Sequence, residues 1–138
     1  MRPAQVTVDC TDPFALADWW RDALGWRDVW RTEVRRHAII GPQDGSGWQL
    51  CFVEVPDPTP GKNRLHLDFS CPDREAQAAA LVAAGARLVR RDAMENDDYG
   101  WIVMADPEGN MFCVSSRGRR APAPRARRPG TITTLAPS

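Results

Sequence analysis

An internal repeat constrains the fold of this chain more than any other feature of its sequence. Residues 3–12 read PAQVTVDCTD and residues 64–73 read RLHLDFSCPD. Both segments alternate apolar and polar residues, which is typical of a half-buried β-strand. Both end at an aspartate, Asp12 or Asp73, and aspartate is a favourable residue for the N-cap of a helix. The repeat therefore predicts two similar units, each beginning with a strand that leads into a helix.

Each aspartate is followed by a segment with helical periodicity. Pro13 takes the favoured first position of a helix, and the apolar residues after it recur at helical spacing until Gly25. The second segment, REAQAAALVAAGA, is rich in alanine and stops at Gly85. Because glycine commonly ends helices, we expect two helices of nearly equal length.

Three further strands are expected after each helix, because β-branched and aromatic residues gather there between turn-rich segments. They are WRDVWRTE, RHAIIG and WQLCFVEV in the first unit, and ARLVRRD, GWIVMAD and NMFCVSS in the second. The predicted fold class is α+β, with two tandem βαβββ units forming a curved mixed sheet around a central cleft. The units cover about residues 4–54 and 64–116, joined by a proline-rich linker at 55–63, in one domain of residues 1–116.

Side chains of each repeated strand alternate between two faces. The apolar face, which includes Cys10 in the first copy and Cys71 in the second, is expected to pack on the helix of its own unit. The polar face is then open and lines the cleft. It holds Gln5, Thr7 and Asp9 in the first copy, and His66, Asp68 and Ser70 in the second.

Composition places the chain among ordinary globular proteins. Apolar residues make up 43% and charged residues 26% of the 138 residues, and no apolar run approaches the roughly 18 residues of a membrane span. The start, MRPAQVTVDC, lacks a hydrophobic signal segment, so a cytoplasmic location is expected. Its four cysteines include no C-x-x-C pair, which argues against a zinc ribbon and a thioredoxin-like redox site.

The charge is distributed unevenly along the chain. Residues 117–138 contain six arginines and no acidic residue, and their proline and alanine content predicts a flexible basic tail. Such a tail can contact nucleic acid through phosphates, but it is more often a solvated appendage. We therefore expect neither nucleic acid nor a membrane as a partner.

Together these motifs resemble the vicinal oxygen chelate superfamily, which includes glyoxalase I, bleomycin-resistance proteins and extradiol dioxygenases, and more narrowly its glyoxalase-like domains. The segments that carry the resemblance are QVTVDCTDPFALADWWRDALGW, KNRLHLDFSCPD with LVAAGARLV, and DPEGNMFCV. The resemblance implies a homodimer and a central ligand or metal site. One divalent ion (Zn, Fe, Ni or Mn), or none, would be held by the first and last strands of the units, at Gln5, Cys51, His66 and Cys113.

The sequence departs from glyoxalase I at the last-strand positions, where the resemblance implies glutamates and this chain has Cys51 and Cys113. In that isomerisation a carboxylate on the metal removes a proton, whereas a thiolate binds metals strongly but is poorly suited to proton transfer. Glyoxalase I activity is therefore not expected. Either the two cysteines ligate a metal such as zinc with Gln5 and His66, or they fill their strands as small hydrophobic residues.

His66 and Asp68 are the candidate catalytic residues. They lie two positions apart on the polar face, where a carboxylate can orient an imidazole or raise its pKa. The alternative for Asp68 is a structural ion pair with Arg64, on the same face. The second histidine, His37, lies in the charged run EVRRHA and is interpreted as a surface residue.

The candidate substrate-binding residues are of three kinds. Trp48 and Trp101 begin strands after glycine-containing loops, where an aromatic ring can stack on a planar ligand, although core packing explains them equally well. Arg64 is suited to an anionic group, although solvated charges are common at strand ends. Thr7 and Asp9 lie on the polar face of the first copy.

Two functions remain open at this stage. The first is a small-molecule-binding protein that acts as a metal-assisted lyase, isomerase or dioxygenase. The second is a non-catalytic protein of the bleomycin-resistance kind that sequesters a ligand between aromatic walls.

Overall fold

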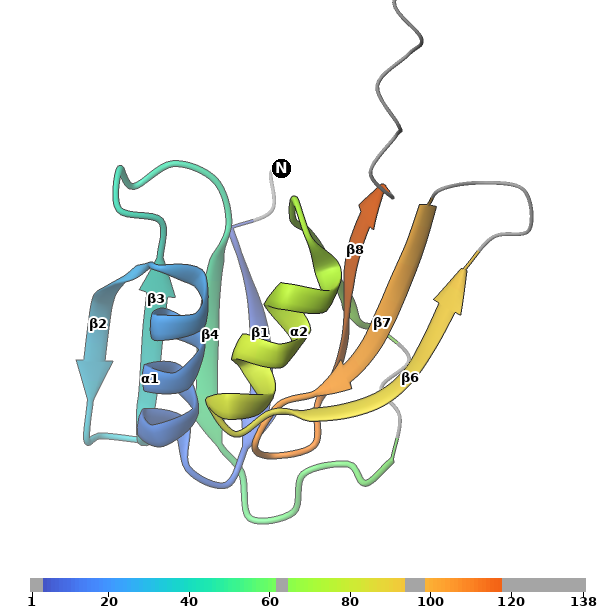
Figure 1. Cartoon of the computed structure of the whole chain (residues 1–138). Helices are drawn as coiled ribbons and strands as arrows, with labels where there is room; N and C mark the ends of the chain where they lie inside the picture. Colours follow the sequence, from blue (N-terminus) through green and yellow to red (C-terminus); the bar gives the residue numbers. More distant parts are fainter. Residues whose placement is uncertain (1–3, 62–64, 94–98, 118–138) are drawn as a thin grey trace, which may run out of the picture.

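The computed structural model describes residues 4–61, 65–93 and 99–117 (Figure 1). The predicted basic tail beyond residue 117 and the side chain of Arg64 lie outside the described residues. The elements in chain order are β1 (Gln5–Cys10), α1 (Pro13–Leu24), β2 (Arg27–Thr32), β3 (His37–Gly41), β4 (Gln49–Glu54), β5 (Leu67–Ser70), α2 (Arg74–Ala83), β6 (Arg87–Ala93), β7 (Tyr99–Ala105) and β8 (Met111–Arg117). The predicted α+β fold of two βαβββ units is confirmed.

Both helices begin as the repeated aspartates predict. The carboxylate of Asp12 accepts hydrogen bonds from the backbone N–H groups of the first turn of α1, and Asp73 does the same for α2. Gly25 ends α1 in the left-handed conformation, with φ of 64°. Helix α2 ends one residue earlier than its glycine predicts, with Ala84 as the cap, and Gly85 takes the positive φ of the following turn.

Hydrogen bonding divides the strands into two four-stranded sheets, with the orders β1-β4-β3-β2 and β5-β8-β7-β6. The edge strand of each sheet, β1 or β5, pairs in parallel with the last strand of its own unit. Thr7 lies opposite Cys51 in the first sheet, and Asp68 lies opposite Cys113 in the second. The two cysteines therefore occupy equivalent positions, as the family resemblance implies.

One face of each sheet packs against the helix of its own unit. Both helices lie on the near side of the sheets in Figure 1, and the core cluster between helices and sheets spans both units. Cys10 is fully buried in this cluster and the half-buried Cys71 packs against it, so both thiols belong to the core side of their strands. No described helix has the length and apolar content that a membrane span requires.

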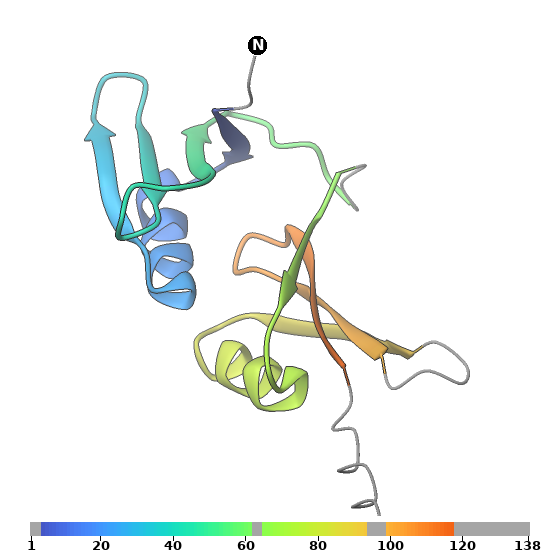
Figure 2. The same ribbon diagram turned by 90° about the horizontal axis from the view of Figure 1, so that it is seen from above.

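The two units lie next to each other, joined by the linker that follows β4 (Figure 2). Helix α1 makes the main contact between them. Trp20 packs its ring against Phe69 and Phe112 of the second unit, with centroids 5.5 and 4.9 Å apart. Its Nε1–H donates a buried hydrogen bond of 3.0 Å to Oδ2 of Asp106, and Trp19 donates to the carbonyl oxygen of Ala84 at 2.8 Å.

A second contact joins the units at the end of β1. The carboxylate of Glu108, in the turn between β7 and β8, accepts hydrogen bonds of 2.8 to 2.9 Å from the backbone N–H and hydroxyl of Thr11 and from the N–H of Asp12. Asp106 holds this turn in shape, because its carboxylate also accepts from the N–H groups of Glu108 and Asn110.

We predict that Asp106→Ala destabilises the protein by about 3 kcal/mol, because it leaves the buried indole N–H of Trp20 and the turn N–H groups without an acceptor. Asp106→Asn keeps one acceptor oxygen and should cost less. Urea unfolding would measure both variants. Asp57→Ala, at an exposed linker position, serves as the control, and an Asp106→Ala protein as stable as this control would contradict the prediction.

We also predict a pH effect from Cys10. Burial, followed by the negative charge of Glu108, raises the pKa of the Cys10 thiol to about 12, whereas an unfolded cysteine has a pKa of about 8.5. Between pH about 8.5 and 12 the thiol ionises only in the unfolded state. The buried thiol therefore contributes its full share of the folding stability below pH about 8.5, and this share falls by up to about 1.4 kcal/mol per pH unit as the pH rises towards 12. The stability difference between wild type and Cys10→Ala, measured by urea unfolding at pH 7 and 10, should shrink accordingly; a constant difference would contradict this.

Candidate functional site

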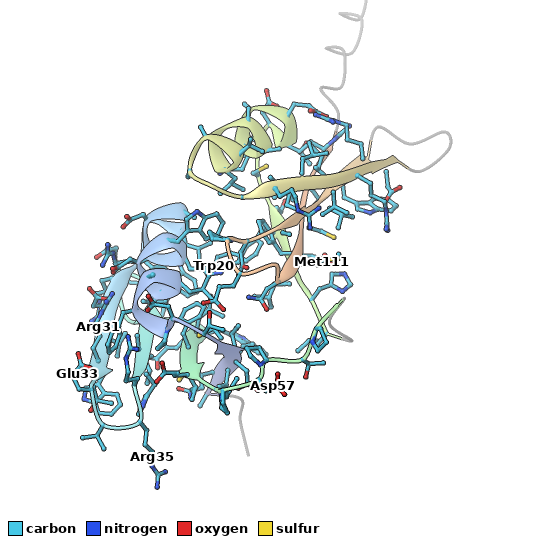
Figure 3. All side chains as sticks on the ribbon, turned by 90° about the horizontal axis from the view of Figure 1, so that it is seen from below. Trp20, Arg31, Glu33, Arg35, Asp57 and Met111 are labelled. Atoms are coloured by element: carbon cyan, nitrogen blue, oxygen red, sulfur yellow. The ribbon has the colours of Figure 1, made fainter. Side chains whose placement is uncertain are left out.

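The space between the two units contains a pocket of about 760 Å³, within the size range of small-molecule sites. Its first wall is apolar and comes from β1 and β4, through Val6, Val8, Leu50 and Phe52. The prediction that only the polar face of β1 lines the cleft is therefore wrong, because the side chains of its apolar face also border the space between the units. The start of β5 and the β7–β8 turn form the opposite wall, and the linker at residues 58–61 also lines it. Trp20 and Met111, labelled in Figure 3, are among the lining residues.

Three potential metal ligands meet beside this pocket. Nε2 of His66 lies 3.5 Å from Oδ1 of Asp68, and one donor atom each of His66, Asp68 and Cys113 lies within 4.8 Å of the others. The parallel pairing of β5 and β8 creates this group, because it sets Asp68 opposite Cys113 and leaves His66 two residues earlier on the same face. His66 itself lines the pocket. In the described part of the chain, no second group of this kind is found.

The first unit has no such group among its described residues. Its equivalent positions are Gln5, Thr7 and Cys51, on the other sheet. Cys51 is buried, and burial raises the pKa of its thiol, opposed by a hydrogen bond with Thr7. The structure therefore joins two of the four ligands that the resemblance implies, His66 and Cys113, adds Asp68 to them, and leaves Cys51 out of the group.

The donor set of the His66 group fits a divalent metal. Imidazole, carboxylate and thiolate are all zinc ligands, and three protein ligands leave a position open for water or substrate, as in catalytic zinc sites. His66 and Asp68 are exposed and Cys113 is buried, so an ion there would be reached from the exposed side. A bound ion would polarise a ligand oxygen or activate water, while Asp68 would orient His66.

The remaining predicted residues are divided between the pocket and its surroundings. Thr7 and Asp9 line the pocket. Trp48 is 56% exposed and is not among the lining residues. Trp101 is half-buried on β7, paired with Ser115 and Asp92 on the same face as Cys113, and it also lies outside the lining.

The open face of the first sheet differs from the polar face that β1 alone predicts. The register across this sheet aligns a row of side chains on the face: Thr7, Cys51, Ile39 and Trp30. Trp30 is 49% exposed, and its ring lies 4.6 Å from that of His37. His37 is thus half-buried beside an aromatic ring, where the sequence analysis interpreted it as a surface residue. The signal was present in RHAIIG and WQLCFVEV, whose residues are apolar on both faces.

Sequence reasoning also missed the acidic residues of the β7–β8 turn. Asp106 is only 4% exposed, and it lines the pocket together with Glu108. The segment DPEGN was predicted only as a turn. The available signal was its leading aspartate, since aspartate side chains commonly hydrogen-bond backbone N–H groups of the turn that follows them, as Asp106 does here.

Comparison with known proteins agrees with this architecture. The model of the family described as Glyoxalase-like domain matches residues 5–115. Among curated proteins, none matches this chain.

Solved structures with the same fold include three of particular interest. A glyoxalase-related enzyme from Fulvimarina pelagi is 21% identical, with a TM-score of 0.66 over 84% of this chain and 88% of that one. A glyoxalase/bleomycin resistance protein/dioxygenase family enzyme from Burkholderia phytofirmans PsJN is 18% identical, with a TM-score of 0.64 over 83% and 97%. TnmS3, an antibiotic binding protein from Streptomyces sp. CB03234, is 19% identical, with a TM-score of 0.61 over 86% and 97%. At these identities the likeness shows the fold alone.

We predict that the protein binds about one Zn²⁺ per chain through the His66 group. His66→Ala and Cys113→Ser should each weaken binding at least tenfold, because each removes one of three ligands. Calorimetric titration with Zn²⁺ measures this. Cys51→Ser, at the equivalent position of the first unit, is the matched control. Equal losses in the Cys51 and Cys113 variants, or no Zn²⁺ uptake by wild type, would contradict the prediction.

Proposed function

Since this chain belongs to the glyoxalase-like domain family, we propose that it binds a small organic molecule in the pocket between its two units. The observation that carries the proposal is the pocket itself, which joins an apolar wall from one unit to a wall from the other that contains His66. Small-molecule sites commonly combine mostly apolar walls with a few polar groups that orient the ligand.

A metal-assisted enzyme is the first form that this function can take. The cluster of His66, Asp68 and Cys113 favours it, because a metal with an open coordination position can polarise a carbonyl oxygen or activate water. His66 would serve as ligand or acid–base group, and Asp68 as its orienting partner. This chemistry suits a lyase, an isomerase or a dioxygenase. Glyoxalase I isomerisation is disfavoured, because Cys51 and Cys113 stand where carboxylates would be needed.

Sequestration without turnover is the second form. The similarity to TnmS3, an antibiotic binding protein, supports this alternative. Metal binding at the His66 group separates the two forms, because sequestration requires no ion.

We further propose that the protein is cytoplasmic and forms a homodimer, with residues 1–116 as the binding domain and the remaining residues as a basic tail. The exposed Trp30 supports the dimer, since large exposed aromatic side chains are enriched at interfaces. Nucleic acid and membrane partners are not part of the proposal.

Filling the pocket tests the proposal. We predict that Val8→Trp, in the apolar wall, weakens the binding of a neutral aromatic probe such as 4-phenyl-1-butanol at least fivefold, because the larger side chain occupies the volume that the probe needs. Val34→Trp is the matched control, since Val34 is 75% exposed and lies outside the pocket lining. Saturation-transfer NMR detects the probe directly. A probe that binds the Val8→Trp protein as well as wild type would place its site elsewhere.

A further inference from the structure

The charged residues that line the pocket indicate which ligand charge it favours. Three carboxylates line it: Asp9 from β1, and Asp106 and Glu108 from the β7–β8 turn. These carboxylates line the same pocket as the apolar side chains of the first wall, so a ligand in the pocket would contact both an apolar surface and negative charge.

None of these three carboxylates is paired with a cationic side chain in the described ranges. Asp106 is buried and accepts hydrogen bonds only from neutral donors, of Trp20, Glu108 and Asn110. Glu108 accepts only from Thr11 and Asp12, and the side chain of Asp9, on a strand paired with β4 through its backbone, makes no hydrogen bond or ion pair with the described residues. These hydrogen bonds satisfy the carboxylate oxygens of the turn but leave their negative charge uncompensated.

The negative charge extends into the protein beside the pocket. The pKa of the buried Cys10 thiol is raised by burial first, and then by the charges of Glu108, Asp12 and Asp106. Cys10 follows Asp9 at the end of β1, so this end of the pocket is electrostatically negative.

Positive charge in the described lining is limited to one guanidinium. Arg87, at the start of β6, is exposed and belongs to the second unit, and His66 is engaged with Asp68. Three carboxylates against one guanidinium leave the described lining with a net negative charge. A desolvated charge is costly unless it is paired, so a cationic group on the ligand would be favoured here.

We propose that the pocket selects ligands that combine an apolar or aromatic body with a positively charged nitrogen, the body lying along the Val6–Val8 wall and the cation beside Asp9 and Glu108. This inference rests on the proposed function and specifies its ligand class. Ammonium and amidinium compounds with a hydrophobic part belong to this class.

Three probes with the same phenylbutyl body test the charge preference: 4-phenylbutylamine, 4-phenyl-1-butanol and 4-phenylbutyrate, which are cationic, neutral and anionic at pH 7. Calorimetric titration of the full chain should give the amine at least a threefold tighter Kd than the alcohol, and the butyrate the weakest Kd. Raising the salt concentration should reduce the advantage of the amine, because salt screens partly exposed charges.

Asp9→Asn is the decisive variant, because Asp9 is exposed and its substitution leaves the contacts between the units intact. It should remove about threefold from the affinity for the amine and leave the affinity for the alcohol unchanged. Glu33→Gln also removes one exposed carboxylate, with a side chain 84% exposed and outside the lining, and should change neither.

The outcomes separate this inference from the function on which it depends. Equal affinities for the three probes, or tightest binding of the butyrate, would overturn the cation preference and leave the small-molecule function standing. Tightest binding of the butyrate would also indicate that Arg87 governs selection. Failure of all three probes to bind would overturn the proposed function and the inference with it.

Discussion

The buried hydrogen bond between Trp20 and Asp106 is the interaction on which the two-unit structure depends. It joins a helix of the first unit to a turn of the second, with no backbone hydrogen bonds pairing strands of the two described sheets. Because Asp106 also fixes the turn that carries Glu108, one carboxylate supports two of the contacts between the units, that of Trp20 and that of Glu108. The width of the pocket between them follows from this geometry, since both residues of the bond are part of its lining.

The two repeated units share their backbone structure but differ in the side chains of their open faces. Equivalent positions hold Gln5, Thr7 and Cys51 in one unit and His66, Asp68 and Cys113 in the other. The second unit therefore carries imidazole, carboxylate and thiol groups on this face, of which His66 reaches the pocket, whereas the first unit has no such group among its described residues. A duplicated fold can divide its work in this way because strand register depends on the backbone and the core face, and not on the side chains of the open face.

The sequence was sufficient for most of the fold and for only part of the site. Caps such as Asp12 and Gly25 act within a few residues, so local pattern locates the elements, and the family resemblance implies that Cys51 and Cys113 are equivalent. The group around His66 was predicted in part, because His66 and Asp68 lie two residues apart in the sequence. The contact between the rings of His37 and Trp30 and the burial of Asp106 depend on packing between strands or units, which periodicity along a single strand does not report.

Two residues of the contact between the units also line the pocket, and this affects how a family of such proteins can diversify. Trp20 and Asp106 hold the units together and face the ligand space at once, so a substitution that reshapes the ligand space there also loosens the molecule. Selection for new ligands would then act mainly on lining positions that do not hold the units together, such as the edge strand at Val6 to Asp9 and the linker at residues 58–61. Relatives should accordingly vary most along this edge strand and linker, and least at Trp20 and Asp106.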